Sequence, residues 1–182
     1  MALLRAINVG GHNKVDMKQL RALFADLGHR DVRTYVQSGN VVFGSASRSA
    51  SSVEKGLQKA IAEATGLDIR VLVRSRDELA RIVDANPFLA GRAELRTLYV
   101  AFLAGAPKAA RVNSVPRSYV EPDEFRVAGR EVYLRYPNGY GRTKLSNAFL
   151  EKQLGVAATT RNWNTVTKLL DMALSPPSPT PG

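Results

Sequence analysis

Residues that could move a proton or bind an anion gather in a polar loop near the start of the chain. This loop reads NVGGHNKV and spans residues 8–15. His12 is its candidate for general acid–base catalysis, because an imidazole titrates near neutral pH. A lone histidine in a loop is more often a surface residue, so this role has a plain structural alternative. The candidate ligand-binding residues of the loop are Asn8, Gly10, Gly11, Asn13 and Lys14.

A second group of candidates lies in the segments PNGYGRTK, residues 137–144, and TTRNWN, residues 159–164. Each segment leads into a predicted helix, whose first backbone N–H groups and positive dipole end attract anions. The alternative is structural: Gly139 and Gly141 would only shape a turn, and Thr160 or Asn162 would only cap a helix. The side chains that would complete this anion cradle are Arg142, Lys144, Arg161, Asn162, Asn164 and Lys168.

Common catalytic and metal-binding motifs are missing from the sequence. The absence of cysteine excludes disulfides and thiolate metal sites, and two histidines are too few for a histidine-rich centre. The GYGR segment lacks the third glycine of a dinucleotide-binding loop, and neither G-x-S-x-G nor H-E-x-x-H occurs. We therefore expect no metal and no cofactor, while the sequence leaves open whether the protein is an enzyme.

The charge favours an anionic partner. The chain of 182 residues has 26 Lys and Arg against 16 Asp and Glu, a net charge of +10 that attracts anions at long range. Since the arginines are scattered, a basic composition without any nucleic-acid site is the alternative. No apolar stretch approaches the ~18 residues that a membrane-spanning helix needs, and the start lacks the features of a secretory signal. We predict a cytoplasmic protein without a membrane partner.

The elements that position the first loop follow the order strand, helix, strand, strand, helix, strand. Asp16 predicts the start of one helix, and Ser51 with Glu54 predicts a capping box for the next. Ser75 with Glu78 predicts another capping box, for the short connecting helix. This order is the split βαβ, or ferredoxin-like, motif. In it the loop after the first strand and the central hairpin leave the same end of the sheet, so both would contribute to one polar rim. The predicted strands cover residues 2–9, both sides of the turn at 38–40, and 69–73, and the hairpin side chains of the rim are Gln37, Ser38 and Asn40.

The same order of elements recurs in the second half of the chain, where the two cradle segments would share one end of the sheet. We therefore predict an α/β (α+β) fold with two ferredoxin-like units in tandem and a C-terminal helix. Strands are expected at 96–103, 124–128, 131–136 and 157–160, and helices near 107–113, 144–154 and 162–174. The predicted division is a first unit at 1–74, a connecting helix and NPF loop at 75–95, a second unit at 96–174 and a disordered tail at 175–182.

Aromatic residues have two readings in the second unit. Trp163 falls on the apolar side of the last predicted helix, which favours a core role. Tyr99 and Tyr133 alternate with apolar residues, so they could share an open sheet face that stacks RNA bases. The alternative, which we favour, is that this face is covered by packing. The first unit lacks the aromatic run of RNA-recognition domains, since its third strand reads NVVF.

Several segments together resemble an uncharacterised bacterial family, domain of unknown function 1697. They are LLRAINVGGHNKV, LRALFADLGHRDVRTYVQSGNVVF, NPF and GRTKLSNAFLEKQLGVAATTRNWNTVTKL, which span Leu3 to about Leu170. The resemblance implies two ferredoxin-like halves in one cytosolic protein, and it implies no established activity. Ala6 departs from the family pattern, which more often has glycine at this position.

Three functions follow from these residues. The first is a binding module for nucleic acid, a nucleotide or another phosphate-bearing anion at the glycine loops and helix starts. The second is an enzyme that acts on a phosphorylated or carboxylated small molecule through the His12 loop. The third is an interaction protein whose polar motifs are purely structural.

Overall fold

The computed structural model describes residues 1–8, 13–91 and 93–175, and the chain divides into two compact units. Met1–Ala80 with Lys168–Gly182 form the first unit, and Arg81–Thr167 form the second. Each unit contains a four-stranded antiparallel sheet and helices, so the predicted mixed fold is confirmed. The boundaries at residues 74, 95 and 174 stay predictions, and the predicted tail beyond Ser175 lies outside the described residues.

The first sheet has the strand order β2-β3-β1-β4, which is the order of a split βαβ unit. β1 is shorter than the predicted strand 2–9. The backbone N–H of Arg5 still bonds to Arg70 O at 2.9 Å, in the register of β1 and β4, but Ala6 takes a positive φ of 54°, which ends the extended chain. The strands are β1 (Ala2–Leu4), β2 (Arg30–Tyr35), β3 (Asn40–Gly44) and β4 (Val71–Val73).

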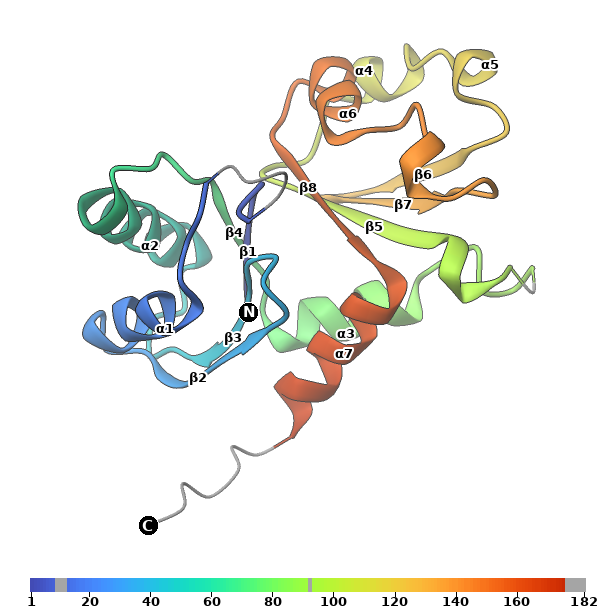
Figure 1. Cartoon of the computed structure of the whole chain (residues 1–182). Helices are drawn as coiled ribbons and strands as arrows, with labels where there is room; N and C mark the ends of the chain where they lie inside the picture. Colours follow the sequence, from blue (N-terminus) through green and yellow to red (C-terminus); the bar gives the residue numbers. More distant parts are fainter. Residues whose placement is uncertain (9–12, 92, 176–182) are drawn as a thin grey trace. The chain divides into compact units, whose positions relative to one another are not determined.

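Two helices, α1 (Met17–Asp26) and α2 (Ala50–Thr65), cover one face of this sheet (Figure 1). They are amphipathic, and their buried sides meet alternate residues of the strands. The resulting core fixes where each strand ends, so the loops at the sheet edges start from defined positions. Its fully buried members include Leu20 and Phe24 of α1, Leu57 and Ile61 of α2, and Ala2, Leu4 and Val41 of the strands.

The helix starts of the first unit confirm two of three predicted caps. Asp16 Oδ1 accepts from the backbone N–H of Gln19 at 2.8 Å, as predicted. The capping box of Ser51 with Glu54 is wrong. Ser49 Oγ caps α2 by accepting from Ser52 N at 3.2 Å, because Ser49 is the last extended residue before the helix.

The third predicted cap begins α3 (Arg76–Asp84). Ser75 Oγ accepts from Glu78 N at 3.1 Å, and the Glu78 carboxylate accepts from Ser75 N at 2.7 Å. Both bonds of a capping box are therefore formed. None of the helices in the described part of the chain is long and apolar enough to cross a membrane.

The second sheet has the order β6-β7-β5-β8, which matches the first when its strands are counted in sequence. Val120 of α5, and Leu150 and Leu154 of α6, pack on one face of the sheet together with Val115 of the link between α4 and α5. α5 is a four-residue helix that was not predicted from the sequence. The strands are β5 (Leu98–Leu103), β6 (Glu124–Ala128), β7 (Glu131–Arg135) and β8 (Ala158–Asn162). The helices are α4 (Ala109–Asn113), α5 (Arg117–Val120), α6 (Asn147–Leu154) and α7 (Trp163–Leu174), with 3-10 turns η1 (Leu95–Thr97) and η2 (Tyr140–Arg142).

The register of β5 and β7 overturns the idea that two tyrosines share an open face. Tyr99 is the cross-strand partner of Leu134, whereas Tyr133 is the partner of Val100. Cross-strand partners point to the same side of a sheet, so Tyr99 and Tyr133 lie on opposite faces. Tyr133 is buried, and its hydroxyl donates to Ile82 O at 3.1 Å, which leaves it no surface for stacking a base.

Candidate functional site

The predicted rim of the first unit is held together by the Asn8 side chain. Its Nδ2 donates to Gln37 O at 2.9 Å and to Val15 O at 3.0 Å, while its Oδ1 accepts from Val15 N at 2.9 Å. The loop and the hairpin are therefore adjacent, as the topology predicts. The amide of Asn8 is used structurally, in the manner of a backbone group.

The other described rim residues divide into structural and accessible ones. Asn40 is fully buried, and its Nδ2 donates to Tyr35 O at 3.1 Å and to Ser38 Oγ at 2.9 Å, so it stabilises the turn. Asn13 Nδ2 donates to Ala6 O at 3.0 Å. Gly10, Gly11 and His12 lie outside the described residues.

A hollow of about 560 Å³ lies beside this rim. Lys14 and Gln37 line it with exposed side chains, so they are the predicted residues that a ligand in the hollow could reach. Asp16, which also caps α1, puts a carboxylate in the same wall. The charge of this hollow is therefore mixed. Its full lining is Asn8, Lys14, Val15, Asp16, Gln19 and Gln37.

The predicted cradle of the second unit lies where β7 and β8 end. Both strands are antiparallel to β5, so the loop after β7 and the start of α7 leave from the same end of the sheet. Arg161 of β8 is 9% exposed and donates to Thr159 Oγ1 at 2.8 Å and to Thr160 O at 2.9 Å. Burial lowers the pKa of Arg161 to about 10, against an opposing effect of Tyr140, so the guanidinium stays charged at neutral pH.

At the beginning of α7, Asn162 and Trp163 have structural roles, as a helix cap and a core residue. Asn162 Oδ1 accepts from Thr165 N at 2.8 Å, which makes Asn162 the helix cap. Trp163 is 4% exposed and has the core role that its position in the helix predicts. Asn164 and Lys168 are exposed on α7, so their side chains remain accessible to a ligand.

Two exposed tyrosines belong to this region, Tyr140 within the cradle loop and Tyr119 in α5, and the sequence did not single them out. Tyr140 is 44% exposed and stacks on Tyr99, with ring centroids 5.4 Å apart and an interplanar angle of 28°. Tyr99 in turn contacts the buried ring of Tyr136 at 4.8 Å. The Tyr136 hydroxyl donates to Leu145 O at 3.0 Å, and burial raises the pKa of Tyr136 well above its usual range.

The second exposed tyrosine, Tyr119, is 53% exposed and stacks on Phe149 at 5.8 Å. Lys144 Nζ lies 4.8 Å from the centre of its ring, in cation–π contact. Arg142 is exposed beside Tyr140 in η2. We call Tyr119, Tyr140, Arg142 and Lys144 the tyrosine loop surface. Its signal in the sequence is a tyrosine between the two glycines of GYGR.

A buried carboxylate fixes the loop that carries this surface. Thr143 Oγ1 donates to Asp123 Oδ2 at 2.6 Å and accepts from Leu145 N at 2.9 Å. Asp123 is 8% exposed, so this bond is shielded from water. Tyr140 and Lys144 thus project from a loop that is tied down between them.

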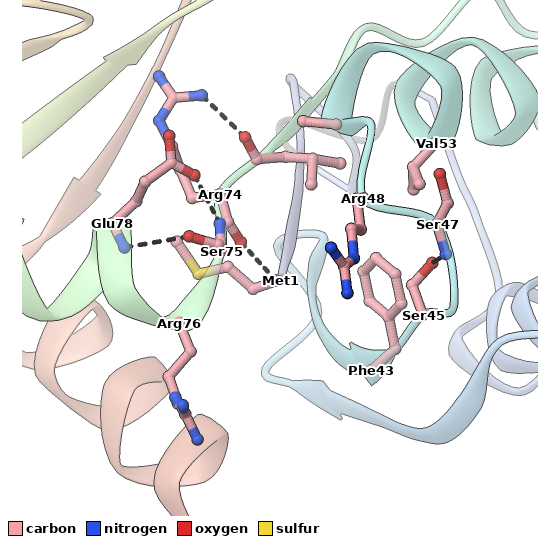
Figure 2. Close-up of a pocket in the computed structure, with 12 residues that line it drawn as sticks. Met1, Phe43, Ser45, Ser47, Arg48, Val53, Arg74, Ser75, Arg76 and Glu78 are labelled. Atoms are coloured by element: carbon pink, nitrogen blue, oxygen red, sulfur yellow. Dashed lines mark hydrogen bonds between the residues drawn. The ribbon is translucent and has the colours of Figure 1, made fainter.

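A pocket of about 420 Å³ lies in the first unit, and sequence reasoning missed it (Figure 2). Its walls are the segment that follows β3 and the segment that follows β4. Met1 lines it as well, and burial lowers the pKa of its α-amino group to about 6, against an opposing effect of Glu78. The residues concerned are Met1, Phe43, Ser45, Ser47, Arg48, Ala50, Val53, Val73, Arg74, Ser75, Arg76 and Glu78.

In the described ranges 1–8, 13–91 and 93–175, no group of three or more His, Cys, Asp or Glu side chains is placed to hold a metal ion. The described side chains of the predicted rim and cradle are mainly basic or amide groups, which suit anions.

Comparisons with known proteins agree with this fold. Residues 1–133 match the family described as "Protein of unknown function (DUF1697)". The chain is also similar to a solved structure, that of the conserved bacterial protein SP0830 from Streptococcus pneumoniae, with 24% sequence identity and a TM-score of 0.67. This similarity covers 94% of the present chain and 96% of the other, and it concerns the fold alone. None of the curated proteins matches the chain.

Proposed function

Because the chain belongs to the family of proteins of unknown function DUF1697, its role must be inferred from its own residues, and we propose that it binds single-stranded nucleic acid or a nucleotide. The site is the tyrosine loop surface of the second unit. One observation carries this proposal: two exposed tyrosines, each stacked on an inner aromatic ring, flank the basic residues Arg142 and Lys144.

Stacking on an inner ring favours base binding for a physical reason. Tyr140, held by Tyr99, loses little side-chain entropy when a base covers its outer face. Tyr119 is held by Phe149 in the same way, and a base that stacks on it would displace Lys144 from its ring. Base–aromatic stacking of this kind contributes roughly 1–3 kcal/mol per base and tolerates any sequence. Arg142 and Lys144 would bind the phosphates between the stacked bases.

The remaining cradle residues have secondary parts in this proposal. Arg161 supplies a buried positive charge next to Tyr140 and holds the end of β8. Asn164, exposed at the start of α7, would contact a phosphate that extends past the loop, whereas Lys168 belongs to the first unit and is not part of this surface. Asn162 supports the surface by capping α7. The cytoplasmic location predicted from the sequence belongs to the same proposal.

The test is the fluorescence anisotropy of a labelled random oligonucleotide of about 12 nucleotides, within the range of known single-strand sites. We expect wild-type affinity to fall steeply between about 50 and 200 mM salt. Tyr140→Ala should weaken binding by roughly 5- to 100-fold, whereas Tyr140→Phe keeps the ring and should bind almost as wild type. Tyr119→Ala should behave like Tyr140→Ala.

A matched pair of arginine variants separates the site from the overall charge. Arg142→Ala and Arg70→Ala each remove one exposed positive charge, and Arg70 lies in the other unit. We expect only Arg142→Ala to weaken binding appreciably. Equal losses from the two arginine variants, or full binding by both tyrosine-to-alanine variants, would contradict the proposed surface.

A second candidate is the enzyme that uses the first loop, and the hollow of about 560 Å³ beside that loop favours it. Lys14 would bind the anionic group of a small substrate, and His12 would transfer a proton. Activity of this kind should follow a pH profile near neutrality that His12→Ala removes. Lys14→Ala should mainly raise KM.

A further inference from the structure

The pocket of Figure 2 is separate from the surface proposed above, because all of its lining residues belong to the first unit. β3 and β4 are both antiparallel to β1, so the segments that follow them leave from the same end of the sheet. These two segments form the facing walls of the pocket. Its volume of about 420 Å³ falls within the range of small-molecule sites, which is roughly 300–1,000 Å³.

Arg48 is the charged group that this pocket directs inward. Figure 2 shows its side chain pointing from the wall after β3 into the space that faces Met1 and Ser75. Arg76 is turned toward its neighbour Asp77, with Nε and Oδ1 3.2 Å apart. The carboxylate of Glu78 is hydrogen-bonded to Ser75 N at 2.7 Å as part of the α3 capping box. The lining thus contains three arginines, Arg48, Arg74 and Arg76, against the one carboxylate of Glu78, so its net charge is positive.

Two serine hydroxyls stand on the same wall as Arg48. Ser45 Oγ accepts from Ser47 N at 3.2 Å, and Ser47 Oγ accepts from Ser49 N at 3.3 Å. A hydroxyl that accepts a backbone bond is held in place and keeps its own hydrogen to donate. Each of these two lining hydroxyls thus keeps a hydrogen that an anion in the pocket can accept.

The rest of the lining is apolar. Phe43, Val53 and Val73 line the pocket, and the Phe43 ring is fixed by contacts with Phe24 at 5.0 Å and His29 at 4.8 Å. A rigid apolar wall beside one positive group and several donors is the composition of a site for an amphipathic small molecule.

We propose that this pocket binds a small organic anion, a phosphate ester whose phosphate pairs with Arg48, Ser45 and Ser47 and whose apolar part lies on Phe43 and Val53. This site is additional to the tyrosine loop surface and does not depend on it. The ligand class follows from the wall chemistry: a guanidinium and hydroxyl donors suit phosphate oxygens, and the aromatic wall suits an apolar substituent.

The test uses phenyl phosphate and inorganic phosphate as probes, titrated into the full chain and followed by amide NMR shifts and calorimetry. We expect phenyl phosphate to shift the amides of Ser45, Ser47 and Ser75. Inorganic phosphate should shift the same amides but bind at least about fivefold more weakly, because it leaves the apolar wall in water. Equal affinity for the two probes would overturn the assigned role of Phe43 and Val53.

Arginine variants supply the decisive comparison. Arg48→Ala should lower the affinity for phenyl phosphate about tenfold or more, which is the loss expected from one charge-assisted contact. Arg70→Ala removes the same charge from an exposed residue at the other end of β4 and should stay within about twofold of wild type. The affinity of Arg48→Lys for phenyl phosphate should lie between those of wild type and Arg48→Ala. Unchanged binding in Arg48→Ala, equal losses in both alanine variants, or shifts confined to amides outside the pocket would overturn the proposal.

Discussion

At the scale of single residues, Gly39 is the position in the first hairpin that tolerates least change. Its φ is 75°, and a Cβ added there would lie 2.7 Å from Leu4 Cβ and 2.9 Å from Ile7 Cγ1. We expect Gly39→Ala to lower the free energy of unfolding by at least about 2 kcal/mol in urea denaturation, because steric overlap adds to the conformational cost.

Gly28→Ala is the matched control. Gly28 has a similar φ of 79°, but no heavy atom lies within 4 Å of the added Cβ. Gly28→Ala should lower the free energy of unfolding by about 1 kcal/mol, which is the conformational cost of a Cβ in this backbone region. If both variants lost the same stability, the close approach of Leu4 and Ile7 would contribute nothing.

Ala6 offers the opposite case, a non-glycine residue in a left-handed conformation with φ of 54°. Ala6→Gly should raise the free energy of unfolding by about 1 kcal/mol, since the Cβ penalty of that conformation disappears. Ala25→Gly makes the same chemical change at an exposed position of α1 and should lower it by about the same amount. Two changes of the same sign would show that backbone conformation does not decide the effect at residue 6.

His29 gives the fold a dependence on pH. It is half-buried against Phe24 and Phe43, and desolvation lowers its pKa below the ordinary value. The folded state therefore favours the neutral ring, and its contribution to stability is present above the unfolded pKa of about 6.5 and lost as the pH falls through the folded pKa. Urea denaturation at about pH 7.5 and pH 5.5, on either side of that value, should show a smaller loss in His29→Gln than in wild type. An identical loss in both proteins would assign the pH dependence to other groups.

At the scale of elements, the last strand of each sheet receives the same contact from the helix that precedes it. Glu54 of α2 accepts from Val73 N in β4 at 2.7 Å, and Glu151 of α6 accepts from Ala158 N in β8 at 2.8 Å. Each carboxylate thus pairs a backbone N–H of an outer strand. The two units share this contact although the residues lie at different distances along the chain.

Removing either carboxylate should leave a backbone N–H of the outer strand without its side-chain acceptor. Glu54→Ala and Glu151→Ala should each lower the free energy of unfolding by about 1–2 kcal/mol, because the backbone donor loses a charged acceptor. Glu54→Gln keeps an acceptor and should lose less. Glu63→Ala, at an exposed position of α2 that pairs with Lys59, should stay within about 0.5 kcal/mol of wild type. A loss at Glu63 as large as that at Glu54 would contradict the special role of the strand contact.

The helices were largely predictable, and the reason is local. A cap such as Asp16 or a box such as Ser75 with Glu78 acts within four residues, so the sequence contains the whole signal. The error at Ser51 has the same origin. Several serines precede α2, and the Glu54 that suggested a capping box is instead bound by β4, a contact between residues 19 positions apart.

The candidate sites were less predictable because they depend on register. Alternation places Tyr99 and Tyr133 relative to their own strands, but only pairing with Leu134 and Val100 assigns each to a face. Arg48 lies in a stretch whose composition predicts only a loop, and its pocket requires knowledge of which strand ends adjoin. Proximity of the Asn8 loop to the hairpin followed from topology alone, since every split βαβ unit places them together.

At the scale of the whole molecule, the net charge of +10 should produce a background of polyanion binding. Heparin, which has no bases to stack, should bind wild type and the Tyr119→Ala, Tyr140→Ala double variant equally and be released by salt. The oligonucleotide should discriminate between the same two proteins. If heparin binding fell together with oligonucleotide binding, the tyrosines would be acting through the fold or the basic residues beside them.

The outer strands finally bear on how the protein behaves when crowded with copies of itself. A sheet edge with unpaired backbone groups is a template for amyloid-like growth. Here Glu54 and Glu151 occupy backbone donors of β4 and β8, the register of β2 shifts between Arg30 and Arg33, and β6 carries Glu124 paired with Arg135. All four edges of the two sheets are therefore blunted, by helix side chains, an irregular register or charge. Addition of a strand from a neighbouring copy is disfavoured at each of them, so high concentrations should not seed fibrils from the folded state.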